Sequence, residues 1–236
     1  MKDKVAFITG GSKGIGYGIA ESLAKVGIHS VLTSRRQDNA DKAAKIISEK
    51  YKVKCLGVEA DVRDFKAVQN AVDKAIEDFG QIDYVIANAG LGHFGNIQDL
   101  SVEEWQEVIE TNLNGVFYTI KSTVDSLIKS KGYFISISSL AGTNFFSGGA
   151  AYNASKFGVT GFTQAVMLDL RQKGVKVSTI MPGSVSTYFN DNEPDSSDAW
   201  KIQIEDLGQM VVDLFKMNPR TLPSKIEVRP SQPPSK

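Results

Sequence analysis

Short apolar runs alternate with longer amphipathic stretches along most of this chain. The first run, from Val5 to Thr9, is rich in β-branched and aromatic residues and reads as a buried strand. Helical periodicity follows most of the later runs. Strands are predicted at 5–9, 29–33, 53–58, 83–87, 133–138 and 175–181, and helices at 17–26, 38–50, 64–79, 101–128 and 150–171.

This alternation predicts an α/β protein with a doubly wound parallel sheet and helices on both faces. With a last strand near Ile226, we expect about seven strands in one domain over residues 1–229. No repeat or low-complexity block interrupts that stretch. The polar segment 184–198 is predicted to be a loop. The tail 230–236 holds three prolines, so we expect it to be extended or disordered.

Composition narrows the classes of partner. Lysine plus arginine equals aspartate plus glutamate at 27 each, so no overall field favours nucleic acid or an anionic membrane. No apolar run approaches the roughly 20 residues of a membrane span. The single cysteine, Cys55, excludes an intramolecular disulfide and fits a reducing compartment. We therefore predict a cytoplasmic protein without a nucleic-acid, membrane or metal partner.

Tyr152 and Lys156 stand four residues apart in the helix predicted from Ala150 to Arg171. Positions i and i+4 share one helix face, so the phenol and the ammonium can reach a common point. A free tyrosine has a pKa of about 10. A nearby positive charge stabilises the phenolate and lowers that pKa, which yields a candidate general acid or base. The alternative is an ordinary amphipathic helix with an exposed lysine.

The turn between the first strand and the first helix is rich in glycine, with the spacing Gly10-x-x-x-Gly14-x-Gly16. Glycines let a backbone approach a pyrophosphate closely, and the helix that follows offers free N–H groups and the positive end of its dipole. The spacing differs from the common G-x-G-x-x-G. A plain tight turn from strand to helix is the alternative.

Arginines occupy the position where an acidic residue would hold the adenosine ribose of NAD. Arg35 and Arg36 follow Ser34 about 20 residues after the glycine turn, and Lys13 adds a positive charge within that turn. An acidic residue would repel a 2′-phosphate, whereas an arginine pairs with it. We therefore predict NADP(H) in preference to NAD(H). The alternative is that both arginines are ordinary solvated charges on the surface.

With these features together, the sequence resembles the short-chain dehydrogenase/reductase family, which implies a Rossmann-type fold. The resemblance extends from about residue 5 to residue 187, and it rests on several short motifs in a fixed order. These are Thr9-Gly10-x-x-x-Gly14-x-Gly16, Asp61-Val62, Asn88-Ala89-Gly90, Asn112, Ser139, Tyr152-x-x-x-Lys156 and Pro182-Gly183-x-Val185-x-Thr187.

The resemblance implies a catalytic tetrad of Asn112, Ser139, Tyr152 and Lys156. In this family the serine hydroxyl binds the substrate carbonyl, and the tyrosine gives its proton to the oxygen as hydride arrives from the nicotinamide. The lysine holds the nicotinamide ribose and lowers the tyrosine pKa. The asparagine supports a water that links the lysine to solvent.

At two positions of that tetrad, two nearby residues of the same type are candidates. Family spacing selects Ser139 over Ser138, which would be a structural hydroxyl at the end of a strand. It also selects Asn112 over Asn114, which would hydrogen-bond within the helical region.

The resemblance also implies the residues that bind the coenzyme. Asp61 would receive the adenine amino group, with Val62 beside the ring; otherwise Asp61 caps the next helix, for which Asp64 is the better candidate. The turn at 88–90 would pass under the coenzyme unless it is a plain turn. The full predicted set is Thr9, Gly10, Ser12, Lys13, Gly14, Ile15, Gly16, Arg35, Arg36, Asp61, Val62, Asn88, Ala89, Gly90, Tyr152, Lys156, Pro182, Gly183, Val185 and Thr187.

Substrate specificity is expected in three loops, at 91–97, 143–149 and 184–200. Their aromatic residues suggest a partly apolar pocket, or else lid and core packing. His93 is predicted to be a loop residue and not a catalytic one, because the tyrosine–lysine pair already supplies an acid. The predicted substrate-binding residues are His93, Asn144, Phe145 and Tyr188.

The expected function is reduction of a small-molecule carbonyl by NADPH. By resemblance, 3-oxoacyl-[acyl-carrier-protein] reductases are the nearest guess, and sepiapterin, polyol and hydroxysteroid activities are rivals. A non-catalytic NADP-binding regulator is a different class of hypothesis, since fold alone does not determine function. The loop after Thr187 is short, which implies an open site. The family resemblance implies a homotetramer, with a dimer as the alternative.

Overall fold

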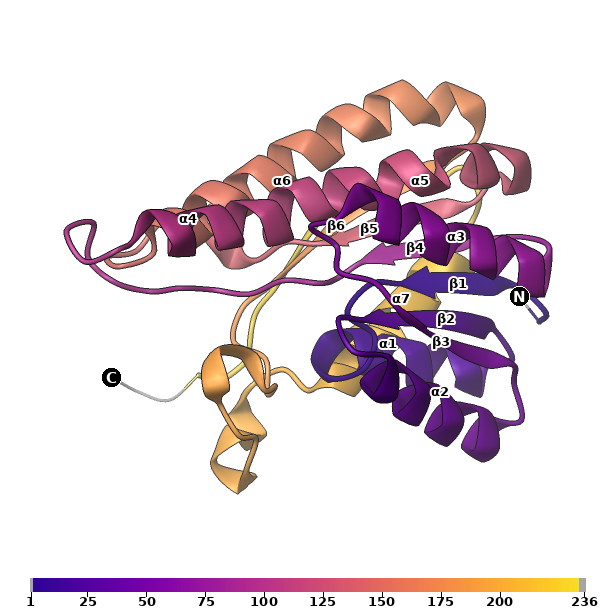
Figure 1. Ribbon diagram of the computed structural model, residues 1–236, viewed down its shortest axis with the longest axis horizontal. Helices are drawn as coiled ribbons and strands as arrows, with labels where there is room; N and C mark the ends of the chain where they lie inside the picture. The colour runs from indigo at the N-terminus through magenta and orange to yellow at the C-terminus, as the bar shows by residue number, and fades with distance from the viewer. Residues whose placement is uncertain (1, 234–236) are drawn as a thin grey trace.

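A seven-stranded parallel sheet forms the centre of the computed structural model, which describes residues 2–233 (Figure 1). The strand order is β3-β2-β1-β4-β5-β6-β7, and every neighbouring pair is parallel. The strands are β1 (Val5–Ile8), β2 (His29–Ser34), β3 (Cys55–Glu59), β4 (Tyr84–Ala87), β5 (Tyr133–Ile137), β6 (Lys176–Pro182) and β7 (Lys225–Val228). The predicted doubly wound fold is confirmed.

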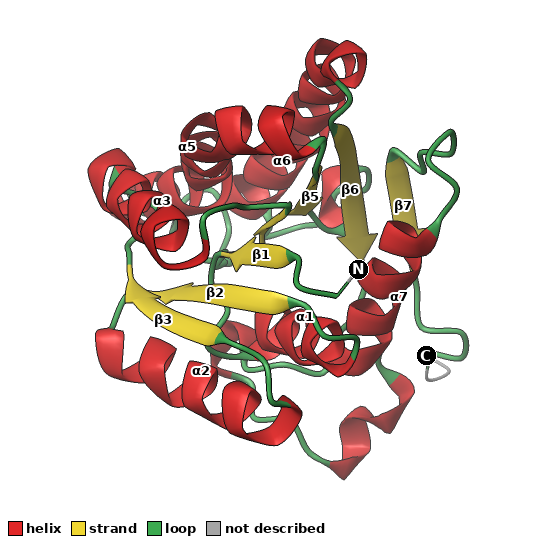
Figure 2. Cartoon of the chain, turned by 90° about the vertical axis from the view of Figure 1, so that its right-hand side faces the viewer, coloured by secondary structure: helices red, strands yellow, loops and turns green. Residues whose placement is uncertain are grey.

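Helices cover both faces of the sheet, because parallel strands need crossover connections that pack back onto it. On one face lie α1 (Gly14–Lys25), α2 (Gln37–Tyr51) and α7 (Ile204–Lys216). On the other lie α3 (Phe65–Phe79), α5 (Gly115–Ser130) and α6 (Ala150–Leu170), as Figure 2 shows. The shorter α4 (Val102–Ile109) precedes α5.

Side chains of each strand alternate between two apolar cores. In β1, Ala6 and Ile8 pack with residues of α1, α2 and α7, whereas Phe7 packs with residues of α3, α5 and α6. All three side chains are fully buried. The strand order reverses between β1 and β4, and in open α/β sheets a ligand binds beyond the carboxyl ends of the strands at such a point.

The helix predicted over 101–128 is not regular. A π-helical turn, Glu110–Asn114, separates α4 from α5. Single π-helical turns of this kind occur frequently at functional sites, and this one contains Asn112. Periodicity alone did not show it, because a five-residue turn is too short to establish a period of its own. Asp64 caps α3 as expected, accepting from the backbone N–H groups of Lys66 and Ala67.

Other boundaries differ from the prediction in smaller ways. Strand β3 begins at Cys55, two residues later than expected, and α1 begins at Gly14, inside the glycine turn. The predicted loop 184–198 contains two short 3₁₀ segments, Phe189–Asp191 and Ser196–Trp200. Residues 230–233 have no regular secondary structure, and the rest of the predicted tail, 234–236, lies outside the described residues. Among the described residues, none of the helices is long and apolar enough to cross a bilayer.

Helix α7 was not predicted, and it packs closely on α1 through two glycines. An ideal Cβ on Gly18 would lie 2.6 Å from the carbonyl oxygen of Ile204, and one on Gly208 would lie 2.5 Å from the carbonyl oxygen of Gly18. Real Cβ atoms do not approach backbone this closely, so the two helices must separate if either glycine gains a side chain.

We expect Gly18→Ala to lower the free energy of unfolding by about 1–3 kcal/mol through overpacking. Gly161→Ala is the matched control, because Gly161 lies inside α6 with nothing within 4 Å of its ideal Cβ. That change should raise stability by about 0.5–1 kcal/mol, since alanine restricts the unfolded chain more than glycine does. Urea unfolding measures both. Equal effects of the two substitutions would contradict the packing described here.

Candidate active site

Tyr152 and Lys156 lie on one face of α6, as their spacing predicts. The Lys156 side chain is buried, and its Nζ donates a hydrogen bond to the carbonyl oxygen of Ile137 at 3.0 Å. The same Nζ lies 5.6 Å from the centroid of the Tyr152 ring. Ile137 ends β5, so the pair stands at the carboxyl edge of the sheet.

The electrostatics of this pair differ from the prediction. Burial raises the pKa of the Tyr152 phenol, while a hydrogen bond with Ser139 acts in the opposite direction. Burial also lowers the pKa of Lys156 to about 8. The phenol pKa is therefore raised and not lowered as the sequence predicts, because desolvation outweighs the hydrogen bond with Ser139. At neutral pH the phenol is protonated.

The two adjacent serines have different surroundings. Ser138 is buried, and its hydroxyl pairs with the Lys156 carbonyl at 3.1 Å and with the Thr160 hydroxyl at 2.9 Å, so it joins β5 to α6. Ser139 lies beyond the strand end and close enough to Tyr152 to hydrogen-bond its phenol. The Ser139 hydroxyl also accepts from the Ala141 backbone N–H at 3.1 Å. Of the two serines, Ser139 is therefore the one whose hydroxyl can bind the same substrate atom as the Tyr152 phenol.

Asn112 joins three segments around the lysine. Its carboxamide bonds both backbone groups of Leu91, at 2.9 and 2.8 Å, and donates to the Ser155 hydroxyl at 3.0 Å. An ideal Cβ on Gly90 would lie 3.2 Å from the Asn112 Oδ1 atom and 3.5 Å from the Lys156 Nζ atom. The structure thus brings together Asn112, Lys156 and the turn after β4.

Hydrogen bonds hold the turn after β4 against the glycine turn. The Thr9 hydroxyl accepts from the backbone N–H groups of Asn88 and Ala89 at 3.0 and 3.2 Å. The Asn88 side chain donates to the carbonyl oxygens of Thr9 and Gly10 at 3.0 and 3.1 Å. Thr9 and Asn88 therefore position the two loops at the carboxyl edge of the sheet.

The glycine turn has the shape that its sequence predicts. Gly10 and Gly14 have φ values of 63° and 59°, in the left-handed region that glycine adopts without strain. An ideal Cβ on Gly16 would lie 2.6 Å from both the Asn88 side-chain nitrogen and the Gly10 carbonyl oxygen. Helix α1 starts at Gly14 with no side-chain hydrogen bond from Lys13 and no acidic residue in its first turn.

These features fit the phosphates of a dinucleotide. The first N–H groups of α1 have no capping side chain, and a helix N-terminus favours an anion. Lys13 is exposed in the turn, and Ser12 and Ile15 are half-buried beside it. Thr187 lies across from the turn, with its side chain 3.7 Å from an ideal Cβ on Gly14. Thr187 belongs to the segment after β6, in which Pro182 ends the strand and Gly183 and Val185 follow.

Ion pairs connect the predicted adenine end to α4. Arg63 bonds the Asp61 carboxylate through three contacts of 2.6–3.0 Å, and it reaches Glu107 on α4 at 3.2 Å. Partial burial raises the pKa of Asp61, but the hydrogen bonds from Arg63 outweigh it and hold that pKa below its ordinary value. Arg35 is exposed and lies 4.0 Å from Glu107. The sequence reasoning missed Arg63, although an arginine two residues after Asp61 was a visible signal.

Two more residues were predicted at the adenine end, and one of them is exposed while the other is buried. Arg36 is exposed at the start of α2, next to Arg35. Val62 is buried, and an ideal Cβ on Gly115 would lie 2.8 Å from its side chain. Val62 therefore packs on the start of α5.

The predicted substrate residues do not form one cluster. The His93 ring pairs with Glu107 at 2.9 Å, so it is turned toward α4. Asn144 donates to the Leu140 carbonyl at 3.2 Å and stays near its own turn. Phe145 is 84% exposed. Tyr188 is half-exposed, with the Lys13 ammonium 5.8 Å from its ring centroid.

Two other aromatic residues contact Tyr152 instead. The ring centroid of Phe94 lies 5.4 Å from that of Tyr152, and the centroid of Phe189 lies 5.7 Å from it. Both phenylalanines were within the loops expected to carry specificity, but nothing in the sequence distinguished them from the neighbouring Phe145 and Tyr188. Which ring faces the helix depends on how each loop folds.

Comparison with known proteins agrees with this geometry. The sequence model of the family described as short chain dehydrogenase matches residues 4–198. A solved alcohol dehydrogenase from the archaeon Thermococcus sibiricus, complexed with 5-hydroxy-NADP, superposes with a TM-score of 0.92 at 31% identity and covers 99% of both chains.

Curated relatives point the same way. An uncharacterised oxidoreductase from Staphylococcus saprophyticus is 33% identical over 98% of both chains. The 3-oxoacyl-[acyl-carrier-protein] reductase of Buchnera aphidicola is 32% identical over 80% of this chain and 76% of its own. With the family match over most of its length and the parallel sheet that its strands form, this chain belongs to the short-chain dehydrogenase family of oxidoreductases.

Proposed function

We propose that this protein is an NADPH-dependent oxidoreductase that reduces a carbonyl to an alcohol, with Tyr152 as the proton donor. One observation carries the proposal: the Tyr152 phenol, the Ser139 hydroxyl and the buried Lys156 ammonium converge at the carboxyl edge of the sheet. This edge also holds the glycine turn, against which the turn after β4 is hydrogen-bonded.

The proposed roles follow from the chemistry of carbonyl reduction. Negative charge develops on the carbonyl oxygen, and donors aimed at that oxygen stabilise the transition state. The protonated Tyr152 phenol donates its proton to the oxygen, and the Ser139 hydroxyl donates a hydrogen bond to it. Lys156 supplies a nearby positive charge. Asn112 positions the segment beside the lysine through Leu91 and Ser155.

Bound NADPH would supply the hydride. The glycine turn and the first N–H groups of α1 would hold its pyrophosphate. Arg35 and Arg36 would pair with the 2′-phosphate, and Lys13 would add charge in the turn. The NADP analogue in the Thermococcus sibiricus structure supports this choice of coenzyme.

We expect the double variant Arg35→Ala, Arg36→Ala to raise the Kd for NADPH about tenfold or more, since a hydrogen bond to a charged group contributes about 1.5–3 kcal/mol. The Kd for NADH should stay nearly constant. Lys45→Ala on α2 is the control, because it removes an exposed positive charge from the helix that follows the two arginines. Fluorescence titration measures the affinities of the wild-type protein and of both variants for the two coenzymes, six values in all. Equal affinity of the wild-type protein for the two coenzymes would refute the preference.

A substrate screen tests the proposed reaction itself. NADPH oxidation is followed with a panel of carbonyl compounds that includes a 3-oxoacyl thioester, a diketone and a pteridine. The Buchnera relative supports the thioester as the first compound to try. Reduction of at least one compound above the blank rate is the expected result. A protein that binds NADPH tightly but reduces none of them would instead fit a non-catalytic NADP-binding regulator.

A further inference from the structure

The carboxylate of Glu107, on α4, is held from two sides. Its Oε1 atom accepts from the Arg63 guanidinium at 3.2 Å, and its Oε2 atom lies 2.9 Å from the Nε2 atom of His93. Arg63 is itself held by three contacts to the Asp61 carboxylate. Glu107 is therefore fixed between the loop after β3 and the loop after β4.

Arg35 faces the same carboxylate more loosely. Its Nη1 atom lies 4.0 Å from the Oε1 atom of Glu107. This distance is too long for a hydrogen bond, so the two groups attract each other by charge and Glu107 does not set the orientation of the guanidinium. The Arg35 side chain is 66% exposed, against 32% for that of Glu107. In this pair, Arg35 is thus the partner that can turn away, and Glu107 is the partner that stays.

We infer that Glu107 sets the strength of the coenzyme preference by competing with the 2′-phosphate of NADPH for Arg35. The inference rests on the proposed function, because it assumes that Arg35 binds that phosphate. A guanidinium binds a phosphate best through two parallel N–H bonds. Because Arg63 and His93 hold Glu107 in place, Arg35 has to leave the carboxylate to make those bonds. NADH has no 2′-phosphate, so its binding leaves the pair of Arg35 and Glu107 intact.

The exposure of this pair limits the size of the effect. Exposed ion pairs contribute little to a free energy, because water screens both charges. A cavity of about 360 Å³ opens beside Glu107, with Arg63 and His93 also in its wall, so solvent reaches the carboxylate. We therefore expect Glu107 to weaken NADPH binding about threefold.

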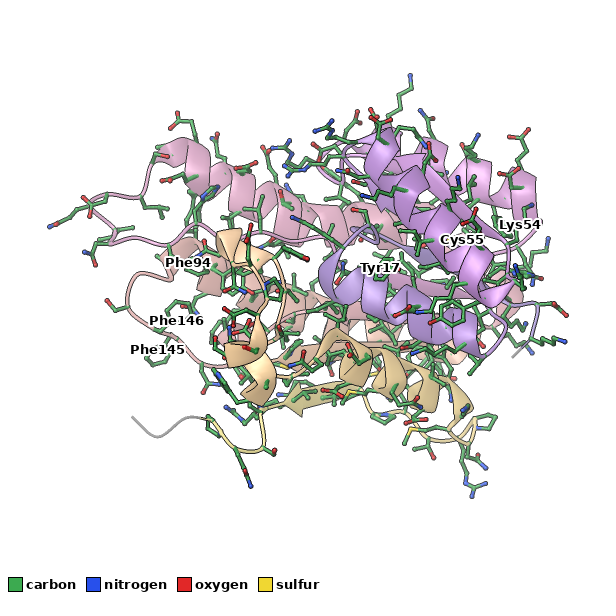
Figure 3. The ribbon with its side chains drawn as sticks, turned by 90° about the horizontal axis from the view of Figure 1, so that it is seen from below. Tyr17, Lys54, Cys55, Phe94, Phe145 and Phe146 are labelled. Atoms are coloured by element: carbon green, nitrogen blue, oxygen red, sulfur yellow. The ribbon has the colours of Figure 1, made fainter. Side chains whose placement is uncertain are left out.

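The His93 side of Glu107 belongs to the loop beside the candidate proton donor. Phe94 follows His93, and its ring centroid lies 5.4 Å from that of Tyr152. Figure 3 shows Phe94 grouped with Phe145 and Phe146 at one end of the molecule. Coenzyme binding is therefore measured without a substrate, so that a change in how this loop contacts a substrate does not enter the measured affinity.

The variant Glu107→Gln tests the competition, because glutamine keeps the size of the side chain and removes its charge. Fluorescence titration measures the Kd for NADPH and for NADH. We expect the Kd for NADPH to fall about threefold and the Kd for NADH to stay nearly constant. Glu103→Gln is the matched control, since it removes the same charge from an exposed position on α4. It should change neither affinity.

Two arginine variants locate the effect. In an Arg35→Ala protein, Glu107→Gln should no longer improve NADPH binding, because the competing guanidinium is gone. In an Arg36→Ala protein it should keep its full effect, because the pair of Arg35 and Glu107 is intact there. An equal improvement in both proteins would overturn the competition, since the carboxylate would then act on the phosphate without Arg35.

The wild-type affinities separate this inference from the proposed function. A wild-type preference for NADPH that Glu107→Gln leaves unchanged or weakens would overturn the inference alone. A preference for NADPH that appears only in Glu107→Gln would support the inference and contradict the coenzyme preference proposed for the wild-type protein. The absence of a preference in both proteins would overturn both.

Discussion

Tyr152→Phe is expected to lower kcat for ketone reduction about 1,000-fold, within the range that a positioned general acid contributes. The variant keeps the ring that packs against Phe94 and Phe189, so the local structure should persist. Only the hydroxyl is lost, and with it the proton that the carbonyl oxygen must receive. Stopped-flow and steady-state assays with the best substrate of the screen measure the effect.

The control for this prediction is coenzyme binding. The Kd for NADPH should change by less than about twofold, because the phenol acts on the carbonyl and a transition-state interaction leaves ground-state binding intact. Ser139→Ala should lower kcat about 100-fold, as expected for the loss of one donor to a developing oxyanion. Turnover of Tyr152→Phe near the wild-type rate would assign the proton to another group.

Lys156→Met is expected to change activity and stability in opposite directions. Turnover should fall about 100-fold, because a charge near the reacting oxygen is lost. Near pH 7 the variant should nevertheless be more stable than the wild-type protein by about 1–2 kcal/mol. Burial lowers the pKa of Lys156 to about 8, which corresponds to a penalty of about 3 kcal/mol for keeping it charged. Losing its hydrogen bond to Ile137 returns about 1–2 kcal/mol of that gain.

The sign of this effect reverses with pH. A lysine whose pKa is lower in the folded state binds fewer protons there than in the unfolded chain, so the stability of the wild-type protein rises between about pH 8 and pH 10.5. The methionine variant lacks this contribution. The wild-type protein should therefore gain on the variant as pH rises through that window and become the more stable of the two. Urea unfolding at pH 7 and pH 10 measures the difference. A constant difference would show that the lysine is not buried as described.

The fold followed from the sequence because its signals are local. Apolar strands of four to seven residues and amphipathic helices repeat in an order that only a parallel sheet accommodates. Helix α7 was missed although its buried apolar residues recur at helical spacing and a capping box starts it. Its pairing with α1, in contrast, has no local signal. Gly18 and Gly208 stand far apart in the sequence, and their close approach appears only when α1 and α7 pack together.

In the candidate site, too, the features fixed by local sequence were predictable and those that depend on distant residues were not. The face shared by Tyr152 and Lys156 was predictable, because helical geometry fixes the relation of residues four apart. The direction of the Tyr152 pKa was not, because it depends on burial beneath rings from other loops. The link from Asp61 through Arg63 to Glu107 likewise joins residues that the chain separates.

Transfer of deuterium from NADPH that carries deuterium at both hydrogen positions of the nicotinamide C4 carbon tests whether Tyr152 assists hydride transfer. In a single turnover, the wild-type protein should give an alcohol with one deuterium on the carbinol carbon. Tyr152→Phe, bound to the same coenzyme at the same occupancy, should give almost none in that time. Equal labelling by the two proteins, or an unlabelled alcohol from the wild-type protein, would contradict hydride transfer assisted by this phenol.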